Sequence, residues 1–486
     1  MKLMEADIIV VAGGPAGLAA ANAAAEGGAS VIVFEKSATT GGAANMGMGI
    51  FAVESCIQQQ GMIGLTKEEV FERFMRATQW KVNARLVRDY FWKSADTVQW
   101  LMDMGVQFFA AMKYFPGSEA TWHVVAPEGG GLPGARAASA MYRIMTEHAK
   151  ELGVNFMLET PVTKLLKDDN KVYGVIAKGK DGEEIEARAK AVIVATGGFG
   201  DNPEMIKKMT GYEMGVDYYG IRVPGMVGDG LRMAWEVGAG KSQIMADKIF
   251  MLPTALDLNY GPLGIVFMQP NLVVNLQGER VMNEALMEHT AYTANVIDRQ
   301  QGKFIVSIID DSIIKRYRKN GLDVPSAVFP GNAADVFGEL FGMAKDTGDQ
   351  FIFEADSIEE LAAQVGIDSE SLEETIKDYN NCCAQNYDDL YDKNRKFLKP
   401  LKGPKFYAAK MYISSYGLLG GIKINYKTEV ITEDYKVIPG LYAAGNDVND
   451  IYGGTYIFEF PGNTMGFAVN SGRMAGEYAA DYINSL

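Results

Sequence analysis

The segment Asp7-Ile-Ile-Val-Val-Ala-Gly-Gly-Pro-Ala-Gly-Leu18 decides the fold of this chain. Its apolar run from Ile8 to Val11 predicts a buried strand, and the glycines that follow predict a tight turn. The alanine-rich stretch from about Ala16 to Glu26 predicts a helix, and Ser30 to Glu35 predicts the next strand. Strand, helix and strand in this order form a βαβ unit, so we expect a Rossmann-like α/β domain with a parallel sheet.

The turn carries the chemistry of this unit. Gly13, Gly14 and Gly17 allow the backbone to approach a pyrophosphate at the N-terminus of the helix. Glu35 stands 21 residues after Gly14, at the end of the second strand, where a carboxylate can accept hydrogen bonds from ribose hydroxyls. Ala12 replaces the first glycine of the usual pattern, and we expect its φ to stay negative because a Cβ disfavours positive φ. These features predict dinucleotide binding rather than a purely structural glycine turn.

The composition is that of a globular protein with an acidic surface. The chain has 486 residues, which exceeds what one hydrophobic core usually serves, so we expect two domains. A formal net charge of -15 would repel nucleic-acid phosphates and anionic lipid headgroups, which argues against both as partners. The three cysteines, Cys56, Cys382 and Cys383, lack C-x-x-C spacing, so we expect neither an iron–sulfur cluster nor a zinc site.

The N-terminal segment passes from Met1 to Asp7 directly into the first strand, which leaves no room for a signal peptide. No apolar stretch of the sequence approaches the roughly 18 residues that a membrane span needs. We therefore expect a cytoplasmic protein without membrane insertion.

Strand signals of the nucleotide-binding type occur towards both ends of the chain. Ala191-Val-Ile-Val-Ala195 runs into Thr196-Gly-Gly-Phe-Gly200, and Gly440-Leu-Tyr-Ala-Ala-Gly445 follows much later. Between them the pattern changes to charged helical stretches, which we interpret as an inserted α+β capping domain. We expect residues 1–240 and 402–486 to form the dinucleotide-binding domain, residues 241–401 to form the capping domain, and a ligand to bind between the two.

Several motifs, taken together, resemble the flavoprotein superfamily of fumarate reductases, succinate dehydrogenases and 3-ketosteroid dehydrogenases over nearly the whole chain. They are the opening segment to Leu18, Gly41-Gly42, the segment 195–200, Gly228-Asp-Gly230 and Ile438-Pro-Gly-Leu-Tyr-Ala-Ala-Gly445. The resemblance implies FAD in the bracketing domain and a mobile capping domain that closes over its isoalloxazine ring. Membrane-bound members attach FAD through a histidine near the Gly41-Gly42 position. No histidine occurs between Gly41 and Ala52, so we expect non-covalent FAD.

The resemblance also indicates which residues contact FAD. Asn463-Thr464-Met465-Gly466 is similar to the segment that directs backbone N–H groups at the flavin pyrimidine edge, where a helix N-terminus stabilises negative charge on the reduced ring. A plain helix N-cap formed by Asn463 or Thr464 is compatible with the same geometry. The expected FAD-contacting residues are Gly13, Gly14, Pro15, Ala16, Gly17, Glu35, Lys36, Gly41, Gly42, Ala43, Gly49, Val162, Ala195, Thr196, Gly197, Gly198, Asp229, Gly445, Asn446, Asn463, Thr464 and Met465.

The sequence departs from fumarate reductases where those enzymes clamp a dicarboxylate. Their histidine-bearing segment is replaced by Tyr416-Gly-Leu-Leu-Gly-Gly421, and the arginine before their final Gly-Gly-Asn is missing from residues 452–461. Arginine and histidine match carboxylate geometry, so their loss argues against a small dicarboxylate as substrate. Tyr416 becomes a candidate catalytic residue by its position.

A second departure concerns proton transfer. Gly278-Glu-Arg-Val-Met-Asn-Glu284 is similar to the segment that precedes the proton-donating arginine of fumarate reductases, but Glu288 stands at the position of that arginine. His289 and Tyr292 lie close by in the sequence. We expect one of the three, foremost His289 or Glu288, to exchange a proton with a substrate carbon, because a carboxyl beside an imidazole can be tuned towards a neutral pKa. The alternative is that Glu288 and His289 are solvated helix residues.

Two further residues are candidates by resemblance. Gly453-Gly-Thr-Tyr456 is similar to the ketosteroid dehydrogenase segment in which the tyrosine donates a hydrogen bond to the substrate ketone. Tyr456 would then polarise a carbonyl, as an oxyanion hole does, or would serve in ordinary packing. His123 falls where the family has a histidine-bearing loop that faces the flavin, and a structural histidine is the alternative.

The sequence as a whole predicts an FAD-dependent oxidoreductase that acts on a C=C or CH–CH bond next to a carbonyl or carboxyl group. We expect an ene-reductase of an enone or of an unsaturated acid other than fumarate. A 3-ketosteroid-type desaturating dehydrogenase, a flavin oxidase or hydroxylase and an electron-transfer flavoprotein subunit are the alternatives. Electrons would come from NAD(P)H or a separate donor, and the sequence shows no second complete nucleotide motif for NAD(P)H.

Overall fold

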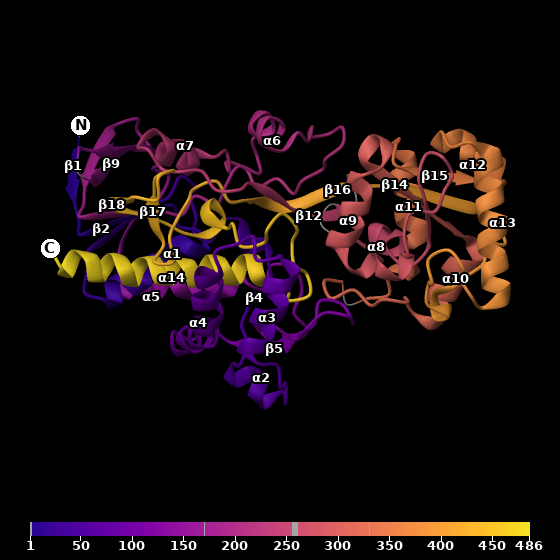
Figure 1. Ribbon diagram of the computed structural model, residues 1–486, viewed down its shortest axis with the longest axis horizontal. Coiled ribbons are helices and arrows are strands. Elements are labelled where there is room, and N and C mark those ends of the chain that lie inside the picture. The colour runs from indigo at the N-terminus through magenta and orange to yellow at the C-terminus, as the bar shows by residue number, and fades with distance from the viewer. Residues whose placement is uncertain (1, 170, 255–260, 330) are drawn as a thin grey trace.

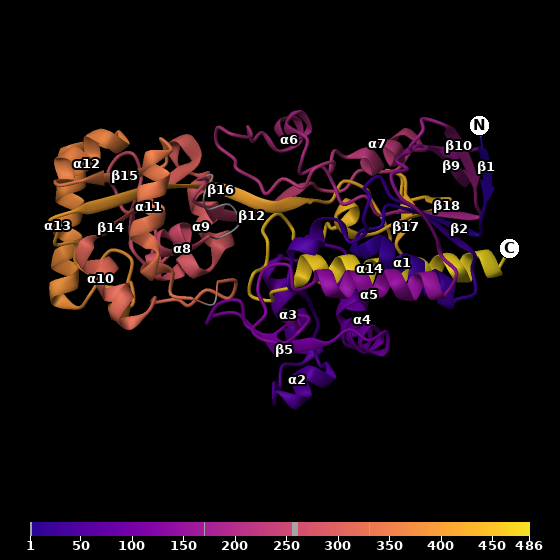
Figure 2. The ribbon, with the colours of Figure 1, turned by 180° about the vertical axis from the view of Figure 1, so that it is seen from behind.

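The computed structural model describes residues 2–169, 171–254, 261–329 and 331–486. Figure 1 shows an elongated molecule in which one part, here called the terminal part, holds both chain ends, and the other, the middle part, holds the central segment. The long strand β16 (Phe406–Leu419) extends from the middle part into the terminal part. The view from behind shows the same arrangement (Figure 2).

A six-stranded sheet forms the centre of the terminal part, in the order β17-β18-β11-β2-β3-β7. Strand β2 (Ile8–Val11) pairs in parallel with β3 (Val31–Phe34) on one side and with β11 (Ala191–Val194) on the other. Every residue of these three strands is buried, because helices cover both faces of such a sheet. The sheet is completed by β7 (Asn155–Met157), β17 (Glu429–Ile431) and β18 (Val437–Ala443).

Helix α1 (Pro15–Glu26) follows β2 directly and packs against α14 (Asn463–Asn484). The two helices meet through very small residues. A Cβ at Gly472 would lie 2.1 Å from the carbonyl oxygen of Ala16, and one at Gly476 would lie 2.3 Å from that of Ala20. The close contact joins the first and the last segments of the chain in one domain, as the two nucleotide-binding signatures predict.

Two smaller sheets and several helices complete the terminal part. One sheet contains β1 (Lys2–Glu5), β10 (Glu184–Arg188), β9 (Val172–Lys178) and β8 (Val162–Lys167), and the other contains β4 (Gly49–Phe51), β6 (Trp122–Val125) and β5 (Phe108–Met112). The helices are α2 (Cys56–Gln60), α3 (Lys67–Ala77), α4 (Ala84–Asp103), α5 (Ser139–Glu151), α6 (Pro203–Thr210) and α7 (Asp229–Glu236).

The middle part is built on an antiparallel sheet with helices around it. Its strands are β12 (Met245–Met251), β16, β14 (Phe304–Asp310) and β13 (Leu272–Val274) in that order, and β15 (Ile352–Ala355) pairs with β16. The helices are α8 (Pro262–Phe267), α9 (Thr290–Asp298), α10 (Asp311–Asn320), α11 (Phe337–Asp346), α12 (Ile358–Val365) and α13 (Ser369–Gln385).

The predicted fold class, a Rossmann-like α/β domain with an inserted α+β domain, is confirmed. The exact division at residues 240 and 401 stays a prediction. Strands β12 and β16 both reach the terminal part, where Met245 pairs with Leu419.

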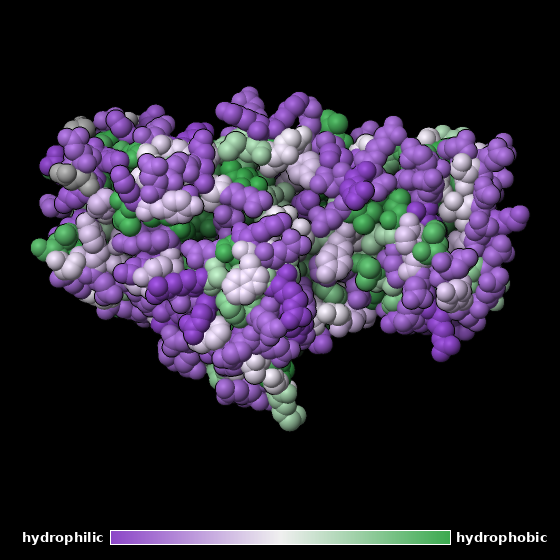
Figure 3. Space-filling view, in the orientation of Figure 1, coloured by the Kyte–Doolittle hydropathy of each residue, from purple (hydrophilic) through white to green (hydrophobic). Residues whose placement is uncertain are grey.

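Figure 3 shows polar and charged residues over most of one face, with apolar residues gathered in a recess of the terminal part. Among the described helices, none combines the length and the apolar composition that crossing a bilayer requires.

Candidate active site

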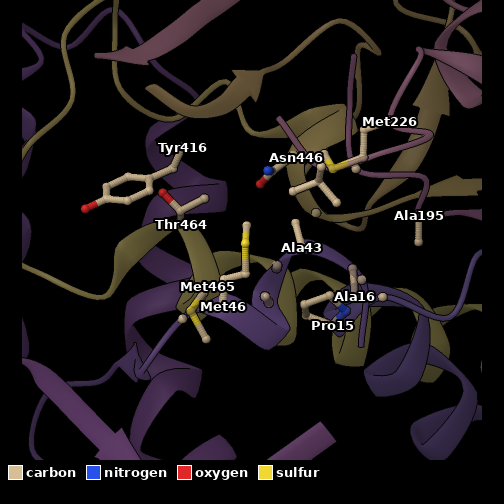
Figure 4. Close-up of a pocket in the computed structure, with 18 of the residues that line it drawn as sticks. Pro15, Ala16, Ala43, Met46, Ala195, Met226, Tyr416, Asn446, Thr464 and Met465 are labelled. Carbon is tan, nitrogen blue, oxygen red and sulfur yellow. The ribbon is translucent and has the colours of Figure 1, made fainter. Parts of the chain in front are cut away.

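A cavity of about 380 Å³ extends from the turn after β2 to the N-terminus of α14. Its wall includes Gly14 and Ala16 from the first βαβ unit, Asn446 and Thr464 from the last part of the chain, and Val328 from the middle part. Figure 4 shows that the lining side chains come from both chain ends. Segments that are distant in the sequence therefore build one site.

The glycine turn leaves the N-terminus of α1 open towards this cavity. Gly14 caps the helix without a side-chain hydrogen bond, and the first turn of α1 contains no acidic residue, so the backbone N–H groups can receive an anion. A Cβ at Gly17 would lie 1.9 Å from the carbonyl oxygen of Ala12, so only glycine fits there. The buried Glu35 carboxylate accepts hydrogen bonds from the backbone N–H groups of Gly13 and Ser37, each at 2.7 Å, and thereby braces the turn.

Ala12 adopts a φ of 84°, so the expectation that its φ stays negative is wrong. Its N–H donates to the carbonyl oxygen of Phe34 at 2.8 Å, which continues the β2–β3 pairing into the turn. The chain must then reverse sharply to begin α1, and this reversal requires left-handed backbone at Ala12. Such backbone costs a residue with a Cβ about 1–2 kcal/mol.

The cavity fits an extended dinucleotide. Open N–H groups lie beside Glu35, small residues line the wall, and the Lys36 ammonium pairs with the Asp229 carboxylate at 2.9 Å. Of the residues that the resemblance implies for FAD, those that line the cavity are Gly14, Pro15, Ala16, Glu35, Lys36, Gly42, Ala43, Gly49, Val162, Ala195, Thr196, Gly197, Asp229, Gly445, Asn446, Thr464 and Met465. The others, Gly13, Gly17, Gly41, Gly198 and Asn463, are not lining residues.

Asp447, which was not predicted from the sequence, joins the segment after β11 to the segment after β18. Its Oδ2 accepts hydrogen bonds from the Thr196 N–H at 2.5 Å, the Thr196 hydroxyl at 2.9 Å and the Gly197 N–H at 3.2 Å. Its Oδ1 accepts one from the Gly198 N–H at 2.8 Å. The acid two residues after Gly445 was the available signal, but its partners lie about 250 positions earlier in the chain.

Aromatic side chains line the cavity near the N-terminus of α14. The ring centroid of Tyr114 lies 5.5 Å from that of Trp122 and 5.4 Å from that of Phe458, and Phe458 lies 4.7 Å from Tyr456. Val328 of the middle part also lines the cavity. The rings of Tyr114, Trp122, Tyr456 and Phe458 are here called the aromatic wall. They are suited to a flat apolar molecule.

A hydrogen-bonded trio of side chains adjoins the aromatic wall. The Thr464 hydroxyl lies 3.0 Å from the Tyr456 hydroxyl and 3.2 Å from Asp247 Oδ2, and the Thr464 N–H donates to the Tyr456 oxygen at 3.3 Å. Burial raises the pKa of Asp247 to about 7, and burial together with the Asp247 charge raises the pKa of Tyr456. Asp247 was missed in the sequence, although an acid within the apolar strand Met245–Met251 was a signal.

The predicted proton donors are not among the lining residues. His289 caps α9, its ring stacks on Tyr292 with 3.5 Å between centroids, and it meets the edge of Phe115 at 5.3 Å. Burial lowers the pKa of His289 to about 4. Glu288 is half-buried, which raises its pKa, and Tyr292 is half-exposed. His289 lies beside the aromatic wall, because its ring centroid is 6.2 Å from that of Phe458.

His123 and Tyr416 occupy different surroundings. His123 is fully buried on β6, where Nε2 lies 2.6 Å from the Ser55 hydroxyl and Nδ1 lies 2.9 Å from the Thr121 carbonyl oxygen. Burial lowers the pKa of His123 to about 4, and the residue does not line the cavity. Tyr416 does line the cavity and is partly exposed (Figure 4).

The segment Gly278–Glu284 forms a buried ion cluster instead of contacting the cavity. Both Arg280 Nη atoms bond to the Asp388 carboxylate at 2.8 Å, and Arg280 also bonds to Glu284 at 2.7 and 3.0 Å. The Lys393 ammonium lies 3.4 Å from Glu284 Oε2. Because an unpaired charge here would be strongly destabilising, the cluster fixes the backbone from which Glu288 and α9 follow.

Comparison with known proteins agrees with this geometry. The sequence matches the FAD binding domain family over residues 7–464. It is 32% identical over 487 residues to the vinyl phenol reductase of Lactiplantibacillus plantarum, covering 98% of this chain and 96% of that protein. It is 30% identical to a fumarate reductase (cytochrome) of Shewanella frigidimarina, covering 98% and 77%.

Solved structures share the fold. The 3-ketosteroid-Δ4-(5α)-dehydrogenase of Rhodococcus jostii RHA1 superposes with a TM-score of 0.78 at 24% identity, covering 98% of this chain and 97% of that one. An open flavocytochrome c3 fumarate reductase gives a TM-score of 0.70 at 25% identity, covering 99% and 79%. The family match and the fold agree with a cavity that begins at the glycine turn, and the chain therefore belongs to the FAD binding domain family, as an FAD-dependent oxidoreductase of the fumarate reductase flavoprotein superfamily.

Proposed function

We propose that the protein is an ene-reductase that saturates a C=C bond conjugated to an aromatic ring, a carbonyl or a carboxyl group, and that fumarate is not its substrate. The observation that carries this proposal is the aromatic wall, where a dicarboxylate would need a group of cations. The name of the vinyl phenol reductase relative supports an aryl-conjugated alkene. FAD in its reduced form would supply the hydride when bound, and the residues of the chain orient the alkene and exclude water.

Within this proposal Tyr456 is the polarising group. Its hydroxyl oxygen accepts a hydrogen bond from the Thr464 N–H, which holds the side chain at the aromatic wall. Its O–H can then donate to an oxygen of the substrate on which negative charge develops, the role of an oxyanion-hole donor. The burial that raises its pKa keeps this proton in place over the working pH range.

The assignment of the α-proton to Glu288, His289 or Tyr292 stays a prediction. The half-buried Glu288, whose pKa burial raises, can remain protonated above the usual range of a carboxyl group. A position near the substrate is supported by the ring of His289, whose centroid lies 6.2 Å from that of the cavity-lining Phe458.

A desaturating dehydrogenase is the second candidate, favoured by Tyr456 in its Gly-x-Thr-Tyr context. We further propose that FAD is bound non-covalently, since the described lining residues include no histidine or cysteine. A cytoplasmic location and electron delivery by NAD(P)H or a separate donor complete the proposal.

The test is anaerobic mixing of photoreduced enzyme with a panel of acceptors: 4-vinylphenol, a cyclic enone, cinnamate and fumarate. We expect flavin reoxidation with one or more of the first three, and a saturated product by mass spectrometry. Oxidised enzyme mixed with a saturated 3-ketosteroid tests the reverse direction. Reoxidation by fumarate alone would contradict the proposal.

A further inference from the structure

One polar atom of the cavity wall lacks a partner. Asp247 lies on β12 with 1% of its surface exposed, and it lines the cavity. Its Oδ2 accepts the Thr464 hydroxyl at 3.2 Å, whereas its Oδ1 has no hydrogen-bond partner among the described residues. A buried carboxyl oxygen without a partner carries an uncompensated desolvation cost, which a donor from a bound molecule can offset.

None of the neighbouring hydroxyls donates to Oδ1 in the structure, and the buried Tyr452 hydroxyl, whose ring lies 4.7 Å from that of Tyr456, has no hydrogen-bond partner among the described residues. The hydroxyls of Tyr456 and Thr464 lie 3.0 Å apart and engage each other, and Thr464 already bonds to the other oxygen of Asp247. The aromatic wall beside them contributes ring surfaces from Trp122 and Phe458. Because Asp247 lines the cavity, a molecule that occupies the cavity can donate the hydrogen bond that Oδ1 lacks.

The charges around Asp247 decide what kind of molecule this is. No described lysine, arginine or histidine bonds to Asp247. Of the basic residues that line the cavity, Lys36 is paired with Asp229, and Arg136 is exposed on its loop. Above its pKa of about 7 Asp247 is ionised, so a carboxylate placed against it would bring a second negative group into a desolvated site, which is strongly unfavourable. A neutral hydroxyl brings a donor without a charge.

We propose that Asp247 is a specificity-determining residue, which accepts a hydrogen bond from a neutral hydroxyl on the ring of the substrate and rejects a carboxylate at the same place. The substrate class is then a hydroxylated aryl alkene, a choice that rests on the proposed function. The aromatic wall holds the ring, and Asp247 identifies the substituent that the ring carries.

Binding of saturated ligands to the oxidised FAD holoenzyme at pH 8, where Asp247 with a pKa of about 7 is ionised, tests this without turnover. We expect 4-ethylphenol to perturb the flavin spectrum with a Kd about 10- to 100-fold lower than that of ethylbenzene, the range for one hydrogen bond to a charged group. 4-Ethylbenzoate should bind more weakly than either. Asp247→Leu should make 4-ethylphenol and ethylbenzene equal, and Asp247→Asn, which keeps the side-chain size, should bind 4-ethylbenzoate at least about 10-fold more tightly than the natural protein.

The flavin content and melting temperature of both variants control for folding. If Asp247→Leu does not fold, the result for Asp247→Asn decides the test. Equal affinity of the natural protein for 4-ethylphenol and ethylbenzene would overturn the proposal. Tight binding of 4-ethylbenzoate that is lost in Arg136→Ala would also overturn the proposal, because the Arg136 cation would then recognise the substituent. Failure of ene-reduction appears only in the turnover panel, so it is distinguishable from failure of this inference.

Discussion

Ala12 shows how a single residue departs from the usual glycine pattern and still forms the turn. Its φ of 84° is backbone that glycine adopts without a steric cost. We predict that Ala12→Gly raises the free energy of unfolding by about 1 kcal/mol, because the strain of a Cβ in this conformation is removed. Thermal unfolding of the FAD-saturated protein measures it. A lower melting temperature would show that Ala12 is not strained.

Tyr456 is the residue on which polarisation of the substrate depends. We predict that Tyr456→Phe lowers turnover about 10- to 1000-fold and leaves FAD bound, as expected for the loss of one oxyanion donor. Steady-state kinetics and the flavin-to-protein ratio measure the two effects. Tyr387→Phe, at an exposed position, is the matched control and should leave turnover unchanged. Normal turnover in Tyr456→Phe would remove this residue from the reaction.

Individual residues also mark where sequence reasoning ends. The glycine turn and Glu35 were predictable because their partners are near in the chain or belong to one recurring unit. Asp247 was not, because its partner Thr464 lies 217 positions away and only the fold brings them together. His123 was a candidate by position, but burial and its bonds to Ser55 and Thr121 hold it away from the cavity wall.

Among the elements, the pair of α1 and α14 has the tightest requirement. We predict that Gly472→Ala lowers the free energy of unfolding by about 3 kcal/mol, because its Cβ would meet Ala16 and overpack the contact. Gly342→Ala on α11 is the control, since nothing lies within 4 Å of its Cβ. Alanine is the better helix former, so Gly342→Ala should stabilise by up to about 1 kcal/mol. Equal melting temperatures for the two variants would contradict the packing account.

Local sequence pattern predicted the elements of the first βαβ unit well. The strand at 8–11 is where the pattern put it, and the helix predicted from about 16 to 26 and the strand predicted at 30–35 are observed at 15–26 and 31–34. Strand β16 was harder to place, because its pairing with β12, β14 and β15 depends on segments far from it in the chain. Pattern alone therefore indicated an inserted domain and left its connection to the first domain open.

For the whole molecule, buried histidines are one contribution to the loss of stability in acid. Burial lowers the pKa of His123 from 6.5 to about 4. Between these two pH values the histidine is protonated in the unfolded chain and neutral in the folded protein. This contribution to stability is present above pH 6.5 and is lost as the pH falls towards 4. Asp247 acts oppositely, since its raised pKa removes stability as the pH rises from 3.8 to about 7.

We therefore predict that His123→Gln melts with a weaker dependence on pH between 6.5 and 4 than the natural protein does. Differential scanning calorimetry of both proteins across this range measures the difference in the pH dependence of their melting temperatures. Asp247 contributes equally in both proteins, so its effect cancels from this difference. Parallel curves for the two proteins would show that His123 is not held neutral by burial.

The central claim is that the assembled cavity holds FAD so that its hydride reaches a conjugated alkene at the aromatic wall. The most direct measurement mixes photoreduced protein with 4-vinylphenol without oxygen and follows flavin absorbance together with product formation. We predict one equivalent of oxidised flavin for each equivalent of 4-ethylphenol formed. Flavin that stays reduced with 4-vinylphenol, the enone and cinnamate, but is reoxidised by fumarate, would contradict the account.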